Sequence, residues 1–77
     1  MVKEINRLEL REKLSKLEHE QWTHWAVQVH NEVSQERQDR WSKIIPLKYE
    51  QLSEELKAHD RFWADKVIDM LEDEGWL

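Results

Sequence analysis

Apolar residues recur along most of the chain at the three- and four-residue spacing that is typical of helices. This spacing predicts one long helix from about Leu8 to Val33. Because each residue turns ~100° about a helix axis, the apolar positions fall on two adjoining sides. One side holds Leu10, Leu14 and Leu17, and the other holds Trp22, Trp25, Ala26, Val29 and Val33. An apolar arc of this width predicts two packing neighbours, one on each flank.

A second, shorter helix is expected between Ser34 and Ile44. Ser34 is a good N-cap, and Glu36 lies in the first turn, where the helix dipole favours an acid. Pro46 ends this helix, because proline cannot donate the backbone hydrogen bond that a helix needs. Residues 46–52 then form an irregular or single-turn connector.

Ser53 caps a third helix, and Gly75 is its expected stop. Beyond it, Trp76 and Leu77 are expected to fold back on the helix end. Its predicted buried stripe consists of Leu56, Trp63, Val67, Met70 and Leu71. These patterns predict an all-α fold in which a long first helix, a short middle helix, a connector and a third helix pack as a small bundle.

The chain has 77 residues, which is enough for one small domain spanning 1–77. A domain of this size is only marginally stable by itself, and without cysteines it has no disulfides. The first helix would span ~40–45 Å and the third only ~30 Å. We therefore expect residues 1–14 to overhang the core, and their leucines to bury themselves in a homo-oligomer.

Composition excludes several classes of protein. One glycine and one proline are too few for a hairpin-rich β fold or a glycine-rich phosphate loop. A net charge of −5 disfavours binding to long nucleic acids. No apolar run is long enough for a membrane span, and the first residues do not resemble a signal peptide. A cytoplasmic location is expected.

A near match to a zinc protease motif fails on geometry. His19 and Glu20 begin an H-E-x-x-H-like run, but the next histidine is His24, five residues after the first instead of four. This spacing turns the second imidazole ~140° away from the first. His30 and His59 have no partner at ligand spacing, and no serine or cysteine stands beside a base. We expect no metal, no cofactor and no catalysis.

Two acids stand among apolar positions. Glu18 lies in the apolar arc of the first helix, and Asp60 lies in the stripe of the third. A carboxylate that loses water there needs a hydrogen-bond or charge partner. One interpretation is structural, with a tryptophan indole, Tyr49 or an arginine donating to each acid. The other is that both acids line a pocket and hold a polar ligand.

The aromatic residues also allow two interpretations. At helical spacing, Trp22, Trp25, Trp41, Trp63 and Tyr49 are typical of a core. Basic side chains also lie near them in the sequence, namely Arg37, Arg40, Lys57 and Arg61. An aromatic face beside such cations could stack a base and hold phosphate. A small anionic ligand is compatible with the net charge, because it needs only a local basic site.

Two sequence blocks resemble the RyR domain, the module first named from ryanodine receptors. Residues 17–22 (LEHEQW) look like the family's "EHxxW" opening, and residues 46–61 (PLKYEQLSEELKAHDR) resemble its second block, roughly "vPYxxLxEexKxxDR". The closing Gly75-Trp76 is similar to the family's terminal "GY". The resemblance covers about residues 15–77. The positions that match the motif are His19, Trp22, Tyr49, Lys57, Asp60 and Arg61.

The chain departs from the family between these blocks. The family carries a Gly-Trp-x-Tyr-Gly segment there, whereas residues 31–35 (NEVSQ) contain neither glycine nor an aromatic residue, and Lys48 separates Pro46 from Tyr49. The resemblance implies a helical, nonenzymatic module that binds a nucleotide-derived ligand. Compact versions look like phage proteins, so the chain is expected to sequester a nucleotide signal used in host defence.

Our leading hypothesis is a ligand-binding module. Its predicted ligand-binding residues are His19, Trp22, Arg40, Tyr49, Lys57, Asp60 and Arg61. A base would stack on Trp or Tyr, and Lys57, Arg61 and Arg40 would neutralise phosphate. The alternative is a phage or prophage protein–protein interaction or oligomerisation module without a small ligand, whose apolar arc binds another helix.

Overall fold

A computed structural model describes residues 4–77 and contains three helices within them. These are α1 (Arg7–Val29), α2 (Gln35–Ile44) and α3 (Glu54–Asp73). Single turns of 3-10 helix, η1 (His30–Glu32) and η2 (Tyr49–Gln51), precede α2 and α3. The described residues form no strand. The predicted all-α fold with a long first helix is confirmed.

Each helix begins where a short polar side chain accepts a backbone hydrogen bond from the first turn. Ser34 accepts from the Arg37 amide and Ser53 from the Leu56 amide, as predicted. Asn6 caps α1 in the same way. The first helix is shorter than expected at its other end, because the chain tightens into η1 after Val29.

The end of α3 is a Schellman motif centred on Gly75. Its φ is +83°, a left-handed conformation that costs glycine nothing and other residues ~1 kcal/mol or more. The Gly75 amide donates to the Glu72 carbonyl at 3.0 Å, and the Trp76 amide donates to the Leu71 carbonyl at 2.8 Å. Gly75 is therefore the predicted stop. The Trp76 side chain, however, is exposed and does not pack back on the helix.

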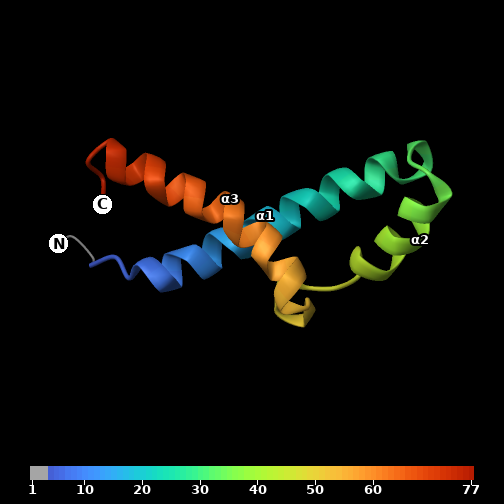
Figure 1. Cartoon of the computed structure of the whole chain (residues 1–77), viewed down its shortest axis with the longest axis horizontal. Coiled ribbons are helices and arrows are strands. Elements are labelled where there is room, and N and C mark those ends of the chain that lie inside the picture. The colour runs from blue at the N-terminus through green and yellow to red at the C-terminus, as the bar shows by residue number, and fades with distance from the viewer. Residues whose placement is uncertain (1–3) are drawn as a thin grey trace.

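Helices α1 and α3 run antiparallel and cross (Figure 1). Helix α2 meets the carboxyl half of α1 through Trp41, which contacts Trp22 and Trp25. The predicted pair of neighbours for α1 is thus present. His30 in η1 helps to hold α2, since its Nε2 lies 3.1 Å from the Gln38 carbonyl oxygen and 3.0 Å from Ser42 Oγ. The molecule measures 49 × 23 × 21 Å. Its radius of gyration of 14.9 Å exceeds the ~11.5 Å expected for a compact chain of this length.

Ion pairs join the amino-terminal half of α1 to α3. Arg7 pairs with Glu72, and Arg11 Nε lies 2.9 Å from Asp65 Oδ1. These contacts correct the expected overhang, because α3 lies along α1 from Arg7 onward. Residues 1–3 lie outside the described residues. Whether the amino-terminal leucines take part in oligomerisation stays a prediction.

The core is built from small and aromatic side chains more than from leucines. Ser15 on α1 and Ala26 and Ala64 on α1 and α3 are fully buried. The other buried residues are His19, Trp41, Tyr49, Leu52 and Ile68. Small residues allow two helix backbones to approach closely, and the large rings fill the space on either side.

The predicted buried stripe of α3 is wrong at three of its five positions. Trp63, Val67 and Met70 are exposed, whereas Leu56 and Leu71 are half-buried. The face of α3 that meets α1 instead carries Arg61, Ala64, Asp65 and Ile68. The apolar periodicity alone could not show this, because the face of α3 that meets α1 also carries Arg61 and Asp65, which form ion pairs with Glu12 and Arg11.

We predict that Ala64→Leu destabilises the fold by about 1–3 kcal/mol, because the side chain has no space at the helix crossing. Ala58→Leu is the matched control, since Ala58 is exposed on the same helix, and it should stay within about 0.5 kcal/mol of the wild type. Urea denaturation followed by tryptophan fluorescence measures both. Equal stabilities for the two variants would contradict the tight crossing.

Candidate ligand-binding groove

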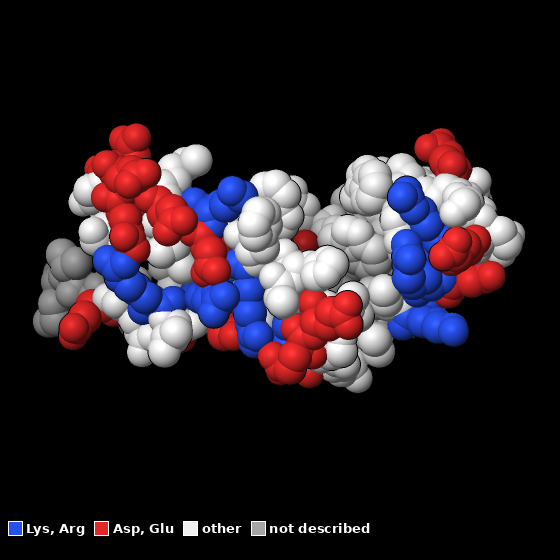
Figure 2. Space-filling model, in the orientation of Figure 1, with Lys and Arg blue, Asp and Glu red and all other residues white. Residues whose placement is uncertain are grey.

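An open groove of about 880 Å³ lies between α2 and α3, over the carboxyl half of α1. Figure 2 shows the hollow between the two parts of the molecule, with mostly uncharged side chains around it. Four of the five tryptophans line it, namely Trp22, Trp25, Trp41 and Trp63. Leu52, Ile44 and Leu56 add aliphatic surface. The polar lining consists of Glu18, His19, Gln21, Arg40, Glu55, His59 and Asp60.

The tryptophans form a connected wall. The Trp41 ring is packed edge-on against Trp22, with centroids 5.5 Å apart, and lies tilted against Trp25 at 5.7 Å. Trp41 is buried, but Trp25 is 52% exposed and Trp63 is 54% exposed. About half of each of these two indoles faces water, and covering that apolar area would be favourable by ~25 cal/mol per Å². These two rings are therefore available to stack on a flat ligand.

His19 is held in one orientation at the inner side of the groove. Its Nε2 donates to the Leu47 carbonyl oxygen at 2.7 Å, because a carbonyl can only accept. This bond ties α1 to the connector before η2. The other nitrogen, Nδ1, faces Asp60 Oδ2 at 3.8 Å, and the ring stacks on Trp22.

Asp60 is the most unusual acid of the groove. Its side chain is only 15% exposed, and burial raises its pKa, with His19 opposing and the nearby Glu18 adding to the shift. Within residues 4–77, no side chain or amide donates a hydrogen bond to its carboxylate, and His19 at 3.8 Å is its only ion-pair partner. The structural interpretation, with an indole, Tyr49 or an arginine donating to Asp60, is not observed. The same holds for Glu18.

Arg40 stands on the opposite wall, on α2. It is exposed, and no acid of the described residues pairs with it. The arginines on α3 and in the first half of α1 are different, since Arg7, Arg11 and Arg61 all form ion pairs. Arg40 is therefore a cation free to bind an anion that enters the groove.

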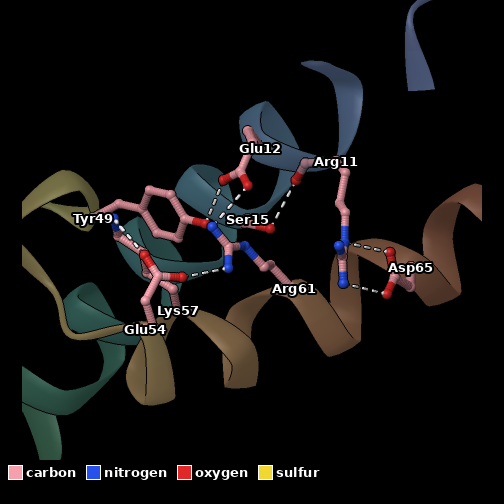
Figure 3. Close-up of polar contacts among 8 residues, drawn as sticks. All are labelled: Arg11, Glu12, Ser15, Tyr49, Glu54, Lys57, Arg61 and Asp65. Atoms are coloured by element: carbon pink, nitrogen blue, oxygen red, sulfur yellow. Dashed lines mark hydrogen bonds and ion pairs between the residues drawn. The ribbon is translucent and has the colours of Figure 1, made fainter. Parts of the chain in front are cut away.

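Three predicted site residues form a separate polar cluster outside the groove lining (Figure 3). The Tyr49 hydroxyl donates to Glu12 Oε2 at 2.5 Å, and Arg61 reaches Glu12 Oε1 at 2.8 Å and Glu54 Oε2 at 2.9 Å. Lys57 Nζ lies 3.7 Å from Glu54 Oε1 and 5.5 Å from the centre of the Tyr49 ring. This cluster joins α1, η2 and α3.

Hydrogen bonds and opposite charges within this cluster shift the pKa values of its members. The Tyr49 hydrogen bond, helped by Arg61, holds the pKa of Glu12 below its ordinary value. Burial and the Glu12 carboxylate raise the pKa of Tyr49. The Arg61 guanidinium lowers the pKa of Glu54. Tyr49, Lys57 and Arg61 thus already pair with two acids, Glu12 and Glu54, which is typical of a structural contact, although the buried Arg61 Nε has no hydrogen-bond partner among the described residues.

The structure therefore divides the seven predicted site residues. His19, Trp22, Arg40 and Asp60 line the groove, and Tyr49, Lys57 and Arg61 do not. The predicted set omitted Glu55, His59 and Trp63, which also line the groove from α3. Of these, Trp63 stands three residues after Asp60, a spacing that places two side chains on one side of a helix and could have revealed it.

The near match to a zinc motif has no geometric counterpart. His19 is buried, whereas His24 is exposed and lies 2.9 Å from Gln28 Nε2. Within the described part of the chain, no group of three or more histidines and acids could hold a metal ion. No helix among these residues is long and apolar enough to cross a membrane.

No protein-family model matches this chain, and no curated protein or solved structure gives a significant match. The resemblance to RyR domains stays a prediction.

Tyr49→Phe is expected to destabilise the fold by about 1–2 kcal/mol at neutral pH, because it removes a hydrogen bond to a charged group. The pKa of Glu12 is lowered in the fold, so its contribution is present above its unfolded value near 4.5 and is lost as the pH falls through its folded value. The difference between wild type and Tyr49→Phe should therefore shrink at low pH.

Urea denaturation at neutral pH and at pH ~3 measures this difference. The control is the same substitution in a Glu12→Gln background, where its cost should be smaller. A cost that is the same at both pH values and in both backgrounds would refute the Tyr49–Glu12 coupling.

Proposed function

We propose that this chain binds a small nucleotide-type ligand in the groove and does not convert it. The observation that carries the proposal is that two side chains of opposite charge line the same tryptophan-walled groove from different helices, and neither has a hydrogen-bond partner among the described residues. Asp60 on α3 lacks a hydrogen-bond donor, and Arg40 on α2 lacks an acid. A ligand with a flat ring, N–H donors on one side and a phosphate on the other would satisfy both.

Each of these contacts is of a kind that contributes to nucleotide binding. Stacking of a base on an aromatic side chain contributes about 1–3 kcal/mol. A guanidinium–phosphate contact is charge-assisted and directional. The groove volume of 880 Å³ lies within the range of ~300–1,000 Å³ that is usual for small-molecule sites. The net charge of −5 favours a ligand with few phosphates over a long nucleic acid.

A protein that binds a nucleotide without converting it lowers the free concentration of that nucleotide. This action fits the sequestration that the RyR resemblance implies, with a phage as the source and the host cytoplasm as the place. Source and place are part of the proposal and rest on the resemblance alone.

Arg40→Ala should weaken nucleotide binding by about tenfold or more, because it removes the free cation of the groove. Arg37→Ala is the matched control, since Arg37 lies on the same helix, is exposed and does not line the groove. Isothermal titration calorimetry with a panel of linear and cyclic nucleotides measures both.

The control should bind like the wild type. If no nucleotide of the panel binds the wild type at millimolar concentration, the proposed function is wrong. If both variants weaken binding equally, the affinity comes from general positive charge on α2 and the groove is not the site.

We also propose that the chain forms a homo-oligomer through α3, which keeps the alternative function of an oligomerisation module open. Val67 and Met70 stand three residues apart on one face of α3 outside the groove lining, and yet both are exposed. The accessible surface of 6329 Å² also exceeds the ~5,000 Å² of a compact monomer of 9.5 kDa. The excess of about 1,300 Å² is larger than the ~800 Å² that each partner buries in a complex of standard size.

Met70→Glu should dissociate the oligomer, because it places a charge in the proposed interface, while the exposed position leaves the fold intact. Leu8→Glu is the control on α1, and it also tests the predicted role of the amino-terminal leucines. Sedimentation velocity over a concentration series measures the mass. A monomeric wild type at every concentration, or dissociation by Leu8→Glu alone, would overturn an interface on α3.

A further inference from the structure

Two carboxylates of the groove lining, Asp60 and Glu18, receive no hydrogen bond from the described residues. The Asp60 carboxylate has two oxygens and receives no hydrogen bond from the described residues. Glu18, which faces it from α1, also lacks a partner among them, and the two acids are close enough for Glu18 to raise the pKa of Asp60. His19 adds no free donor at Nε2, because that N–H is committed to Leu47. A ligand with N–H donors would supply the hydrogen bonds that these two carboxylates lack.

The common bases differ in the donors that their pairing edges offer. Guanine presents two neighbouring donors, N1–H and the 2-amino group. Adenine and cytosine each present one amino group beside a ring nitrogen that accepts, and uracil presents one N–H between two carbonyl oxygens. An ionised carboxylate accepts at both oxygens, as it does from arginine, so it repels a ring nitrogen or a carbonyl placed against it.

The remaining groups of the groove match a nucleotide in this orientation. Trp25 and Trp63 line the same groove as the two acids and leave about half of their surfaces open. Arg40 stands across the groove on α2, away from Asp60 on α3. A base whose edge meets Asp60 would thus have tryptophan against its face and its phosphate toward α2.

We propose that the groove selects a guanine-type nucleotide, with Asp60 accepting from N1–H and the 2-amino group and Arg40 binding the phosphate. This inference rests on the proposed function and adds the identity of the base. The second carboxylate, Glu18, strengthens the discrimination because its negative charge disfavours any base edge that presents an acceptor.

The test compares GMP, IMP and AMP by titration calorimetry. IMP has the N1–H but lacks the 2-amino group, and AMP has an acceptor in place of N1–H. The wild type should bind GMP about tenfold more tightly than IMP, and IMP more tightly than AMP. Asp60→Asn presents one acceptor and one donor, so it should weaken GMP binding and bring the three affinities together.

Asp69→Asn is the matched control, because Asp69 is an exposed acid on the same helix outside the groove lining, and it should keep the wild-type order. Equal binding of GMP and AMP by the wild type would overturn the guanine preference and leave the proposed function standing. Binding of none of the three, nor of any other nucleotide, would overturn both. The wild-type order tests the inference even if Asp60→Asn fails to fold.

Discussion

The hydrogen-bonded cluster of Tyr49, Glu12 and Arg61 is the joint on which the rest of the structure depends. It fastens η2 and α3 to α1 beside the point where the two long helices cross. The fully buried Ser15 and Ala64 keep the crossing tight, and Arg11–Asp65 and Arg7–Glu72 extend it toward the ends of both helices. A chain this short has little apolar core, so directional polar contacts set how its helices are placed.

The groove is a consequence of that placement. Helix α3 crosses α1 and continues along its amino-terminal half. The carboxyl half of α1 is therefore free of α3 and contacts α2 instead. Trp41 bridges α2 to the tryptophans of α1, and His19 ties α1 to the connector through Leu47. The space between α2 and α3 is left open, with aromatic walls and with Asp60 facing it. The helix placement that leaves the groove open thus depends on the cluster of Tyr49, Glu12 and Arg61, and none of these three residues lines the groove.

Local signals in the sequence predicted much of this fold. Ser34, Ser53 and Gly75 mark helix ends through their own backbone chemistry, so they could be identified without knowing any tertiary contact. The rotation of α3 could not be predicted in this way. Its apolar periodicity favoured Trp63 and Val67 as core residues, but the face that meets α1 carries Arg61 and Asp65, which form ion pairs with α1.

The same limit applies to the candidate site. Asp60 was recognised as an acid among apolar positions, and the structure places it in the groove, whereas Arg61, the next residue, points into the joint. Adjacent residues on a helix face ~100° apart, so a motif that contains both cannot assign one role to both.

The central claim is that the tryptophan-walled groove is where the ligand binds, and the five indole N–H signals in a ¹H–¹⁵N spectrum test it most directly. During a titration with GMP, the signals of Trp25 and Trp63 should shift, while that of Trp76, which is exposed and outside the groove, should stay fixed. A spectrum in which only Trp76 moves, or in which no indole responds, would contradict the account.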